Sequence, residues 1–436
     1  MGGSRQQLVI DVLEDAFADL MAADPRAFRV KFRKMAADPF AFYRGSACLF
    51  YADVTGREDP WADERTGAVW IHGDLHVENF GTYMNSHGRL VFDINDFDEA
   101  YVGHFSWDLR RFAASLALMC WQKALPEQAV RDLIEGYLRA YVDQVRHYVN
   151  EEGDDGFALH LDNTEGPVHA LLVRARKNSR LAMLDGMTER RNHVRMFGDL
   201  GGGRPLEDAE RRTVMAAFAE YLDTIPERKR FDRELFYDVR DVVGKTGFGI
   251  GSAGLPAYNL LLEGFSQSLD NDVVLSMKQA NVPAVSRFVD AGRIERYFDH
   301  QGHRTSVSQR ALQVHSDPLL GHTRLDGVGY VVSEISPYET DLDWGEVNEP
   351  DEVAQVVGLL GRATAKAHCA SDADSEQDLV SFQTEEAIAD VLEGRDDELI
   401  EELSEFALGY ATQVREDHAL FVEAFRQGRI GGVSAA

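Results

Sequence analysis

The chain reads HGDLHVEN at residues 72–79, directly after a short apolar run at residues 67–71. The run predicts a buried strand, and the string after it predicts a loop where that strand ends. Transfer of a phosphoryl group needs a carboxylate that orients and deprotonates the attacking hydroxyl. It also needs an amide oxygen about one turn of loop away that holds a metal ion. Asp74 and Asn79 have this spacing, so we interpret the string as a candidate catalytic loop with Asp74 as the base.

Two histidines in the same string, His72 and His76, allow a different interpretation. Residues four apart face one side of a helix, where paired histidines can bind zinc. Gly73 and Asp74 disfavour a helix at this position. We therefore prefer the catalytic loop to a metal hydrolase, with His76 as a further candidate catalytic residue.

Three more motifs follow along the chain. DFD (96–98) comes after the apolar run RLVFDI (89–94), GIGSAG (249–254) lies between two apolar runs, and Lys278 ends the run VVLSMK. A glycine-rich turn is by itself a weak signal, but the sequence after it predicts a strand, which argues against a Rossmann fingerprint. Lysines that close a strand are usually surface residues. Only 8 of the 45 basic residues are lysines, however, and this makes Lys278 more informative.

Together these motifs resemble the active site of the protein-kinase-like superfamily, and HGDLH resembles its aminoglycoside and choline kinase branch. The resemblance implies that Asp96 is the carboxylate that binds Mg²⁺, with Asn79 as a second ligand. It also implies that Lys278 pairs with the phosphates of ATP, which the backbone of the glycine turn covers. The residues assigned to that turn are Gly249, Gly251, Ser252 and Gly254.

Other positions take their roles from the same resemblance. Asp108 is expected to cap a helix and hold the catalytic loop, and Glu334 lies on the strand expected to contact adenine. The acidic partner of Lys278 is not evident, because the helix predicted at 305–316 offers Gln309, and Glu295 is the other candidate. We interpret Asp93 and Asp98 as solvated turn residues, although both could compete for the metal.

The chain is also identified as a member of the DUF2252 family, a domain of unknown function. Arg44, in the first matching string, is a candidate for binding substrate or phosphate, with a buried structural ion pair as the alternative. The matching strings are MAADPFAFYRG (35–45), GDLHVENFG (73–81), FDINDFDEA (92–100), WDLRRFAASL (107–116), VVGKTGFGIGSAG (242–254), SDPLLG (316–321) and YATQVREDH (410–418).

The order of the motifs is the reverse of the kinase order, in which the glycine loop and the lysine come first. We therefore predict an α+β, two-lobed, kinase-like fold that is circularly permuted. Residues 1–235 form a helical catalytic lobe and residues 236–345 form a β-rich nucleotide-binding lobe. Residues 346–436 form helices that return to the large lobe.

Composition excludes several classes of protein. With 44% apolar and 27% charged residues, the chain is an ordinary folded protein. A net charge of −29 argues against nucleic-acid and anionic-membrane partners, which need a basic face. Three separated cysteines predict neither a disulfide framework nor a zinc ribbon, and we find neither a signal peptide nor a membrane span. We expect a cytoplasmic protein.

The expected activity is transfer of a phosphoryl group from ATP, with Mg²⁺, to a hydroxyl of a small molecule; a protein acceptor stays open. Transfer of AMP by the same ligands is one alternative. A pseudokinase, which binds nucleotide and regulates a partner without catalysis, is the other.

Overall fold

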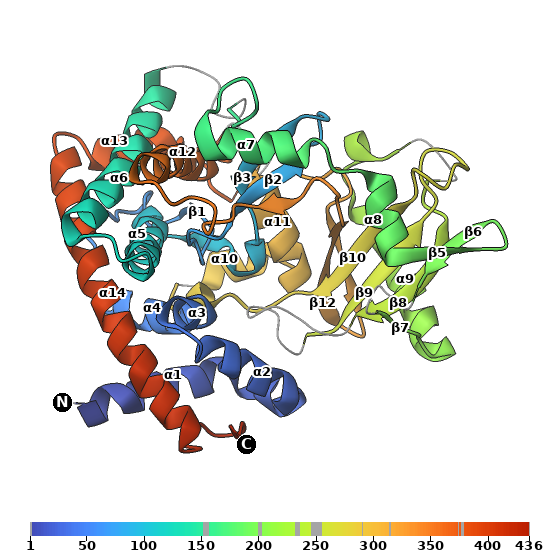
Figure 1. Ribbon diagram of the computed structural model, residues 1–436, viewed down its shortest axis with the longest axis horizontal. Helices are drawn as coiled ribbons and strands as arrows, with labels where there is room; N and C mark the ends of the chain where they lie inside the picture. Colours follow the sequence, from blue (N-terminus) through green and yellow to red (C-terminus); the bar gives the residue numbers. More distant parts are fainter. Residues whose placement is uncertain are drawn as a thin grey trace.

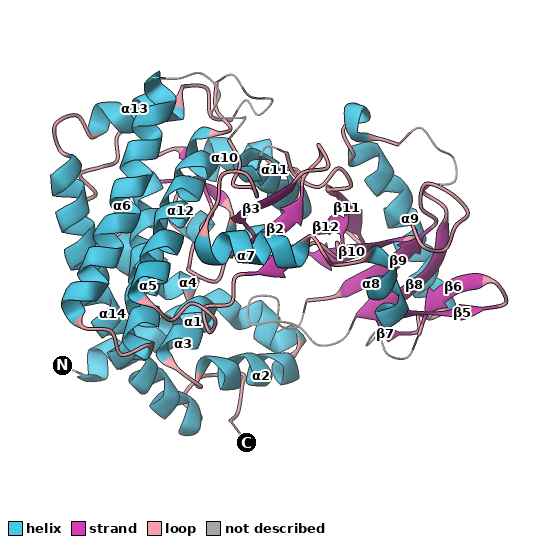
Figure 2. Cartoon of the chain, turned by 45° about the horizontal axis from the view of Figure 1, so that its top comes forward, coloured by secondary structure: helices cyan, strands magenta, loops and turns pink. Residues whose placement is uncertain are grey.

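The computed structural model describes residues 2–150, 157–198, 203–231, 236–245, 255–289, 291–313, 315–373, 375 and 379–435. Helices fill one side of the molecule, and the larger sheet lies at the other side (Figure 1). Coloured by secondary structure, the strands gather in the middle and at the sheet side (Figure 2). The expected α+β class is confirmed. No described helix has the length and apolar character needed to cross a membrane.

The helical side is built from both ends of the chain. The long C-terminal helix α14 packs against α1, α3, α5 and α6, and the two termini lie on the same side of the molecule (Figure 1). Its helices are α1 (Gly2–Ala23), α2 (Pro25–Met35), α3 (Pro39–Gly45), α4 (Ala47–Val54), α5 (Phe105–Gln122), α6 (Glu127–Asn150), α7 (Gly166–Ala175), α12 (Pro350–Cys369), α13 (Thr384–Val391) and α14 (Asp396–Arg426).

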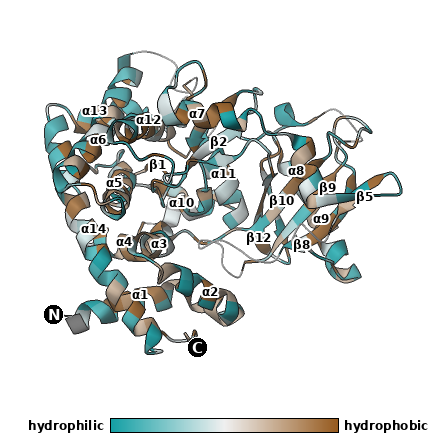
Figure 3. Ribbon diagram, viewed as in Figure 1, coloured by the Kyte–Doolittle hydropathy of each residue, from teal (hydrophilic) through white to brown (hydrophobic). Residues whose placement is uncertain are grey.

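The centre of this side is the contact of α6 with α12 and the burial of α5 between its neighbours. Gly361 lets α12 approach α6 closely, because a Cβ at this position would collide with the carbonyl oxygen of Tyr137. Almost all of α5 is buried, from Phe105 to Cys120. Figure 3 shows hydrophobic residues along α5, while hydrophilic residues mark the outer helices. The burial of apolar side chains here is the main source of stability.

The sheet side has a core of its own. Six antiparallel strands are ordered β11-β12-β10-β9-β8-β7, and α9 (Asp208–Thr224) packs on β11 through residues such as Phe218 and Tyr221. The strands are β7 (Gly203–Arg204), β8 (Val239–Lys245), β9 (Ala257–Leu262), β10 (Val273–Gln279), β11 (Gly321–Leu325) and β12 (Val328–Glu334). The lobe boundary at residue 236 stays a prediction, but α9, which precedes it, belongs by its packing to the core of the sheet.

Short strands and helices lie between the two sides. In the three-stranded sheet, β13 pairs with β2 and β2 pairs with β3, while β1 pairs with β4. These elements are β1 (Val69–Ile71), β2 (Phe80–Met84), β3 (Leu90–Ile94), the 3-10 turn η1 (Phe97–Glu99), β4 (Tyr101–Gly103), the 3-10 turn η4 (Ala284–Arg287), α10 (Ala291–Tyr297), α11 (Gln301–Gln313) and β13 (Thr340–Asp341). The strand β2 was not expected.

Two helices, α7 and α8 (Arg180–Met187), follow each other along the chain. The second begins where the side chain of Ser179 caps it by accepting from the N–H of Ala182. The charged segment after it forms a hairpin, β5 (Thr188–Arg191) and β6 (Val194–Phe197). Asn192 and His193 both have positive φ there, the geometry of a two-residue hairpin turn.

A buried ion pair joins α12 to β3. The ammonium of Lys366 pairs with Asp93 and donates a hydrogen bond of 2.9 Å to the carbonyl of Leu312. Asp93 is therefore not the solvated turn acid expected from the sequence. Burial raises the pKa of its carboxyl, although the adjacent Lys366 acts in the opposite direction.

We predict that Lys366→Ala lowers the free energy of unfolding by about 3–5 kcal/mol, because it leaves the carboxylate of Asp93 buried without a partner. The exposed pair Arg65–Asp390 is the matched control, and Arg65→Ala should cost less than about 1 kcal/mol. Urea denaturation measures both changes. Equal costs at the two sites would contradict the interpretation of Lys366 as a structural cation.

Candidate functional site

The turn that begins the HGDLHVEN string is held by a buried carboxylate. Asp108, on α5, accepts hydrogen bonds from the backbone N–H of His72 at 2.6 Å and of Gly73 at 3.0 Å. Gly73 has φ +80°, and a Cβ there would collide with the carbonyl oxygen of Glu99. The turn therefore needs glycine. The hydroxyl of Tyr51 donates to the carbonyl of Gly73 at 2.7 Å and adds a further restraint.

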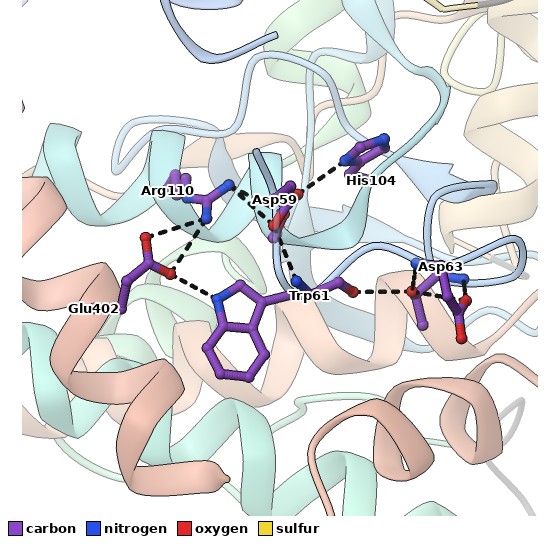
Figure 4. Close-up of polar contacts among 8 residues, drawn as sticks. Asp59, Trp61, Asp63, His104, Arg110 and Glu402 are labelled. Atoms are coloured by element: carbon purple, nitrogen blue, oxygen red, sulfur yellow. Dashed lines mark hydrogen bonds and ion pairs between the residues drawn. The ribbon is translucent and has the colours of Figure 1, made fainter. Parts of the chain in front are cut away.

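The helix that carries Asp108 is anchored on both sides. His368, on α12, lies 3.2 Å from the Asp108 carboxylate. At the beginning of α5, Arg110 contacts Asp59 and Glu402, and the indole N–H of Trp61 donates to Glu402 at 2.6 Å (Figure 4). This network ties α5 to the loop that contains Asp59 and Trp61 and to α14, so the packed helices set the position of the turn at His72 and Gly73.

Asp74 is held by a buried arginine. The Nε of Arg111, one helical position beyond Arg110, donates to Oδ1 of Asp74 at 2.7 Å, and its guanidinium also donates to the carbonyl of Tyr43 at 3.1 Å. The Asp74 side chain keeps 18% of its surface exposed, whereas that of Arg111 is fully buried. Burial raises the pKa of Asp74, and Arg111 acts against that shift. One oxygen of the carboxylate is thus fixed while the group still reaches solvent.

The two other residues predicted from this string have different surroundings. The amide nitrogen of Asn79 donates to the carbonyl of Asp74 at 3.0 Å, and its amide oxygen accepts no hydrogen bond from the described residues. Asn79 is only 3% exposed and lines neither of the cavities described below. His76 is buried with its ring against Phe40, and burial lowers its pKa well below the usual value. His76 is therefore a neutral imidazole, and it lines neither of the cavities described below.

Asp96 lies at the next turn, where the backbone takes an unusual conformation. Its φ is +58°, and the preceding carbonyl, that of Asn95, lies 2.8 Å from Nε2 of His72. The residue is exposed, and it lines the two cavities described below, where nearby protein atoms partly desolvate its carboxyl. That partial desolvation raises its pKa, and the negative charge of Asp98 adds to the shift.

Lys278 pairs with Asp98 across 180 residues of sequence. Asp98 is therefore not a solvated turn acid. It is the acidic partner of Lys278, which the sequence suggested on the helix after that lysine. Burial lowers the pKa of Lys278, but Asp98 and Asp96 more than offset this effect, so the pKa is raised. This ion pair brings β10 of the large sheet to the turn that carries Asp96.

Two cavities meet at these acidic residues. The sheet-side cavity, of about 350 Å³, and the N-terminal cavity, of about 210 Å³, share Asp96 and Asp98. The sheet-side cavity is further lined by residues including Ser276, Lys278, Gln309, Asp317, Ser333 and Glu334. The N-terminal cavity is further lined by residues including Lys31, Arg44, Asp74, Glu99, Asn281 and Arg287.

Comparison with known families identifies the chain. The family model described as "Uncharacterized protein conserved in bacteria (DUF2252)" matches residues 23–424. The chain belongs to the DUF2252 family. Neither curated proteins nor solved structures give a significant match. Because the family description names no activity, the function of this DUF2252 protein has to be argued from its site.

Several residues that the sequence predicted for the site of this DUF2252 protein line the two cavities but have contacts other than those expected. Arg44 pairs with Glu78, and Glu334 pairs with Arg180. The backbone N–H of Glu334 donates to the carboxylate of Asp317 at 2.7 Å, so the protein itself occupies that donor. The side-chain amide of Gln309 donates to Gln313 at 3.1 Å, and it does not contact Lys278.

Two sets of predicted residues fall outside what the structure describes. Gly249, Gly251, Ser252 and Gly254 lie in the undescribed range 246–254. Glu295 belongs to α10, but its side chain is also outside the described part of the chain.

Sequence reasoning missed two buried arginines. Arg111 stands in the quoted string WDLRRFAASL, where a charge on an otherwise apolar helix was a usable signal. Arg304, on α11, donates to the carbonyl oxygens of Asp98 at 2.9 Å, Ala100 at 2.8 Å and Asn281 at 2.7 Å. It joins the DFD turn to the segment after β10, and no local sequence pattern indicates such a role.

We predict that Lys278→Met and Asp98→Asn are energetically coupled. Each single change leaves one buried or half-buried charge without its partner. The double variant should therefore lose less free energy of unfolding than the sum of the two single variants, by about 1–3 kcal/mol. Urea denaturation of the four proteins measures the coupling. The same cycle with Lys278→Met and the distant change Asp390→Asn should show no coupling energy. Equal coupling energies in both cycles would exclude a specific interaction between Lys278 and Asp98.

Proposed function

We propose that this DUF2252 protein is an ATP- and Mg²⁺-dependent phosphotransferase that phosphorylates a hydroxyl of a small molecule. The single observation that carries the proposal is the meeting of two cavities at Asp96 and Asp98. A phosphotransferase needs a donor site and an acceptor site that share the place of transfer. We assign the sheet-side cavity to the nucleotide and the N-terminal cavity to the acceptor.

The donor assignment is supported by the placement of Lys278. It lies on the third strand of the meander β8, β9, β10, and the glycine-rich sequence falls between the first two of these strands. Protein kinases carry their glycine-rich loop and phosphate-binding lysine in this relation. In a kinase-like fold that is circularly permuted, the helical part with Asp74 comes first and this sheet second.

The site also fits magnesium. Mg²⁺ is usually bound by one or two carboxylates together with substrate phosphates and water. Asp96 would supply a carboxylate and Asn79 its free amide oxygen. The described residues hold no cluster of three or more His, Cys, Asp or Glu side chains that could bind a metal alone, so phosphate oxygens would complete the shell. The ion would neutralise phosphate charge during transfer.

Asp74 suits the role of base on the acceptor side. It would take the proton of the acceptor hydroxyl as the hydroxyl oxygen bonds to the γ-phosphorus and the bond to the bridging oxygen of ADP breaks. The hydrogen bonds to Arg111 and the turn held by Asp108 fix its orientation. The small N-terminal cavity favours a small-molecule acceptor over a folded protein surface.

A nucleotide-binding module without catalysis is the second candidate, and one observation favours it. Lys278 and Asp74 both have ion-pair partners within the protein, Asp98 and Arg111. Nucleotide binding at this site would have to replace or rearrange the pair of Lys278 with Asp98. AMP transfer by the same residues is distinguished by its product.

We predict that the protein binds ATP more tightly with Mg²⁺ than without it, measured by calorimetry. Lys278→Ala and Asp96→Ala should each weaken binding at least about tenfold, a loss of about 1.4 kcal/mol, because each removes a phosphate or metal contact. Asp74→Ala should retain ATP binding and lose turnover in an acceptor screen. Arg65→Ala, far from the cavities on an exposed pair, is the control.

The outcomes separate the candidates. No ATP binding by the wild type would exclude both nucleotide functions. Binding without turnover, with a cellular phenotype unchanged by Asp74→Ala, would favour the regulatory module. Release of pyrophosphate and attachment of AMP, detected by mass spectrometry, would indicate nucleotidyl transfer.

A further inference from the structure

The N-terminal cavity contains one buried cation that no ion pair explains. Lys31 lies on α2 with 4% of its surface exposed, and it lines the cavity. Its ammonium nitrogen is 4.0 Å from the centre of the Phe17 ring and 5.5 Å from that of Phe28. In the described part of the chain it has no hydrogen bond and no carboxylate partner. A cation on aromatic faces recovers only part of the hydration lost on burial.

The other cations of this cavity are neutralised by the protein. Arg44 pairs with Glu78, and Arg287 donates to Asp15 at 2.8 Å. Lys31 differs from them. It is the most deeply buried of the three, and it is the only one that forms no ion pair with a carboxylate among the described residues. An ammonium group in this position is suited to a partner that comes from outside the chain.

The acids of the cavity are already engaged. Glu99 accepts hydrogen bonds from the backbone N–H of Ala284 and from the side chain of Asn281 at 3.1 Å. Asp74 and Asp98 have their own basic partners, Arg111 and Lys278. Asp96 is assigned above to a metal, and Asp19 is exposed at the rim, where water solvates it. The cavity therefore offers an unused positive charge in its interior and no unused interior carboxylate for a cationic acceptor.

We propose that Lys31 binds an anionic group of the acceptor, so that the acceptor is a small hydroxyl compound carrying a carboxylate or a phosphate. This inference rests on the proposed function for the identity of the ligand as an acceptor, but the anion site itself does not depend on catalysis. The cavity of about 210 Å³ suits a compound of only a few carbon atoms. Both Lys31 and Asp74 line this cavity, so a bound compound can present its anionic group to Lys31 and a hydroxyl to Asp74.

The ammonium is charged under ordinary conditions. Burial lowers the pKa of Lys31 to about 8, and the nearby Cys48, Glu99 and Asp74 act against that shift. At pH 7 the group still carries its proton, and a bound anion would favour the charged form further.

The test uses two anionic probes, D-glycerate and sn-glycerol 3-phosphate, with glycerol and choline as neutral and cationic comparisons. Calorimetric titration of the full chain without nucleotide should show binding of at least one anionic probe and weaker or no binding of glycerol and choline. Lys31→Met, which keeps the length of the side chain and removes its charge, should weaken anion binding at least tenfold. Lys34→Met, an exposed residue on the same helix, should leave it unchanged.

Folding and chemistry are controlled separately. Lys31→Arg retains the charge and should retain more anion binding than Lys31→Met, and thermal unfolding checks that both variants fold. Wild-type affinity of Lys31→Met for the anions would overturn the proposal, as would tighter binding of choline or no binding of either anion. If ATP fails to bind while the anions still bind through Lys31, the phosphotransferase function fails and the anion site stands.

Discussion

Burying a cation is costly unless carboxylate or carbonyl oxygens contact it, and this constraint organises the centre of the molecule. Lys366 pairs with Asp93, Arg111 with Asp74 and Lys278 with Asp98, while Arg304 is held by backbone carbonyls. Each of these contacts joins elements that are far apart in the chain. Three of them converge on the turns that carry the candidate catalytic acids, so the same charges that stabilise the cleft also set its chemistry.

The sequence was informative where local rules decide the structure. The run at 67–71 and the run RLVFDI contain the strands β1 and β3, because short apolar runs bounded by turn signals favour buried strands. The strand β2 was missed because FGTYM follows the HGDLHVEN string without a turn signal. The hairpin β5–β6 was missed because its charged side chains do not alternate with apolar ones.

The candidate site was predictable as a set of residues but not as a set of contacts. The spacing of Asp74 and Asn79, and the DFD string, carry a local signal for phosphoryl-transfer chemistry. Partners such as Asp98 for Lys278 do not, since the two residues are 180 positions apart and several acids could serve. Burial is equally invisible locally, and for this reason Asp93 and Asp98 were taken for solvated residues. Tertiary packing decides both properties.

The strong negative net charge of the protein disfavours the binding of anions. A charge of −29 repels a nucleotide or an acidic acceptor at long range, so any binding has to come from cations placed within about a Debye length, roughly 8 Å at physiological salt. Most of the cations named above pair with carboxylates of the protein itself. Lys278 is partly exposed, and under the proposed function it would exchange Asp98 for a phosphate. Lys31 has no carboxylate partner within the described residues. The two lysines line the two cavities that share Asp96, Lys278 from the sheet and Lys31 from the N-terminal helices. Under the proposed function, a nucleotide at Lys278 and an anionic acceptor at Lys31 would therefore place the transferred group beside Asp96.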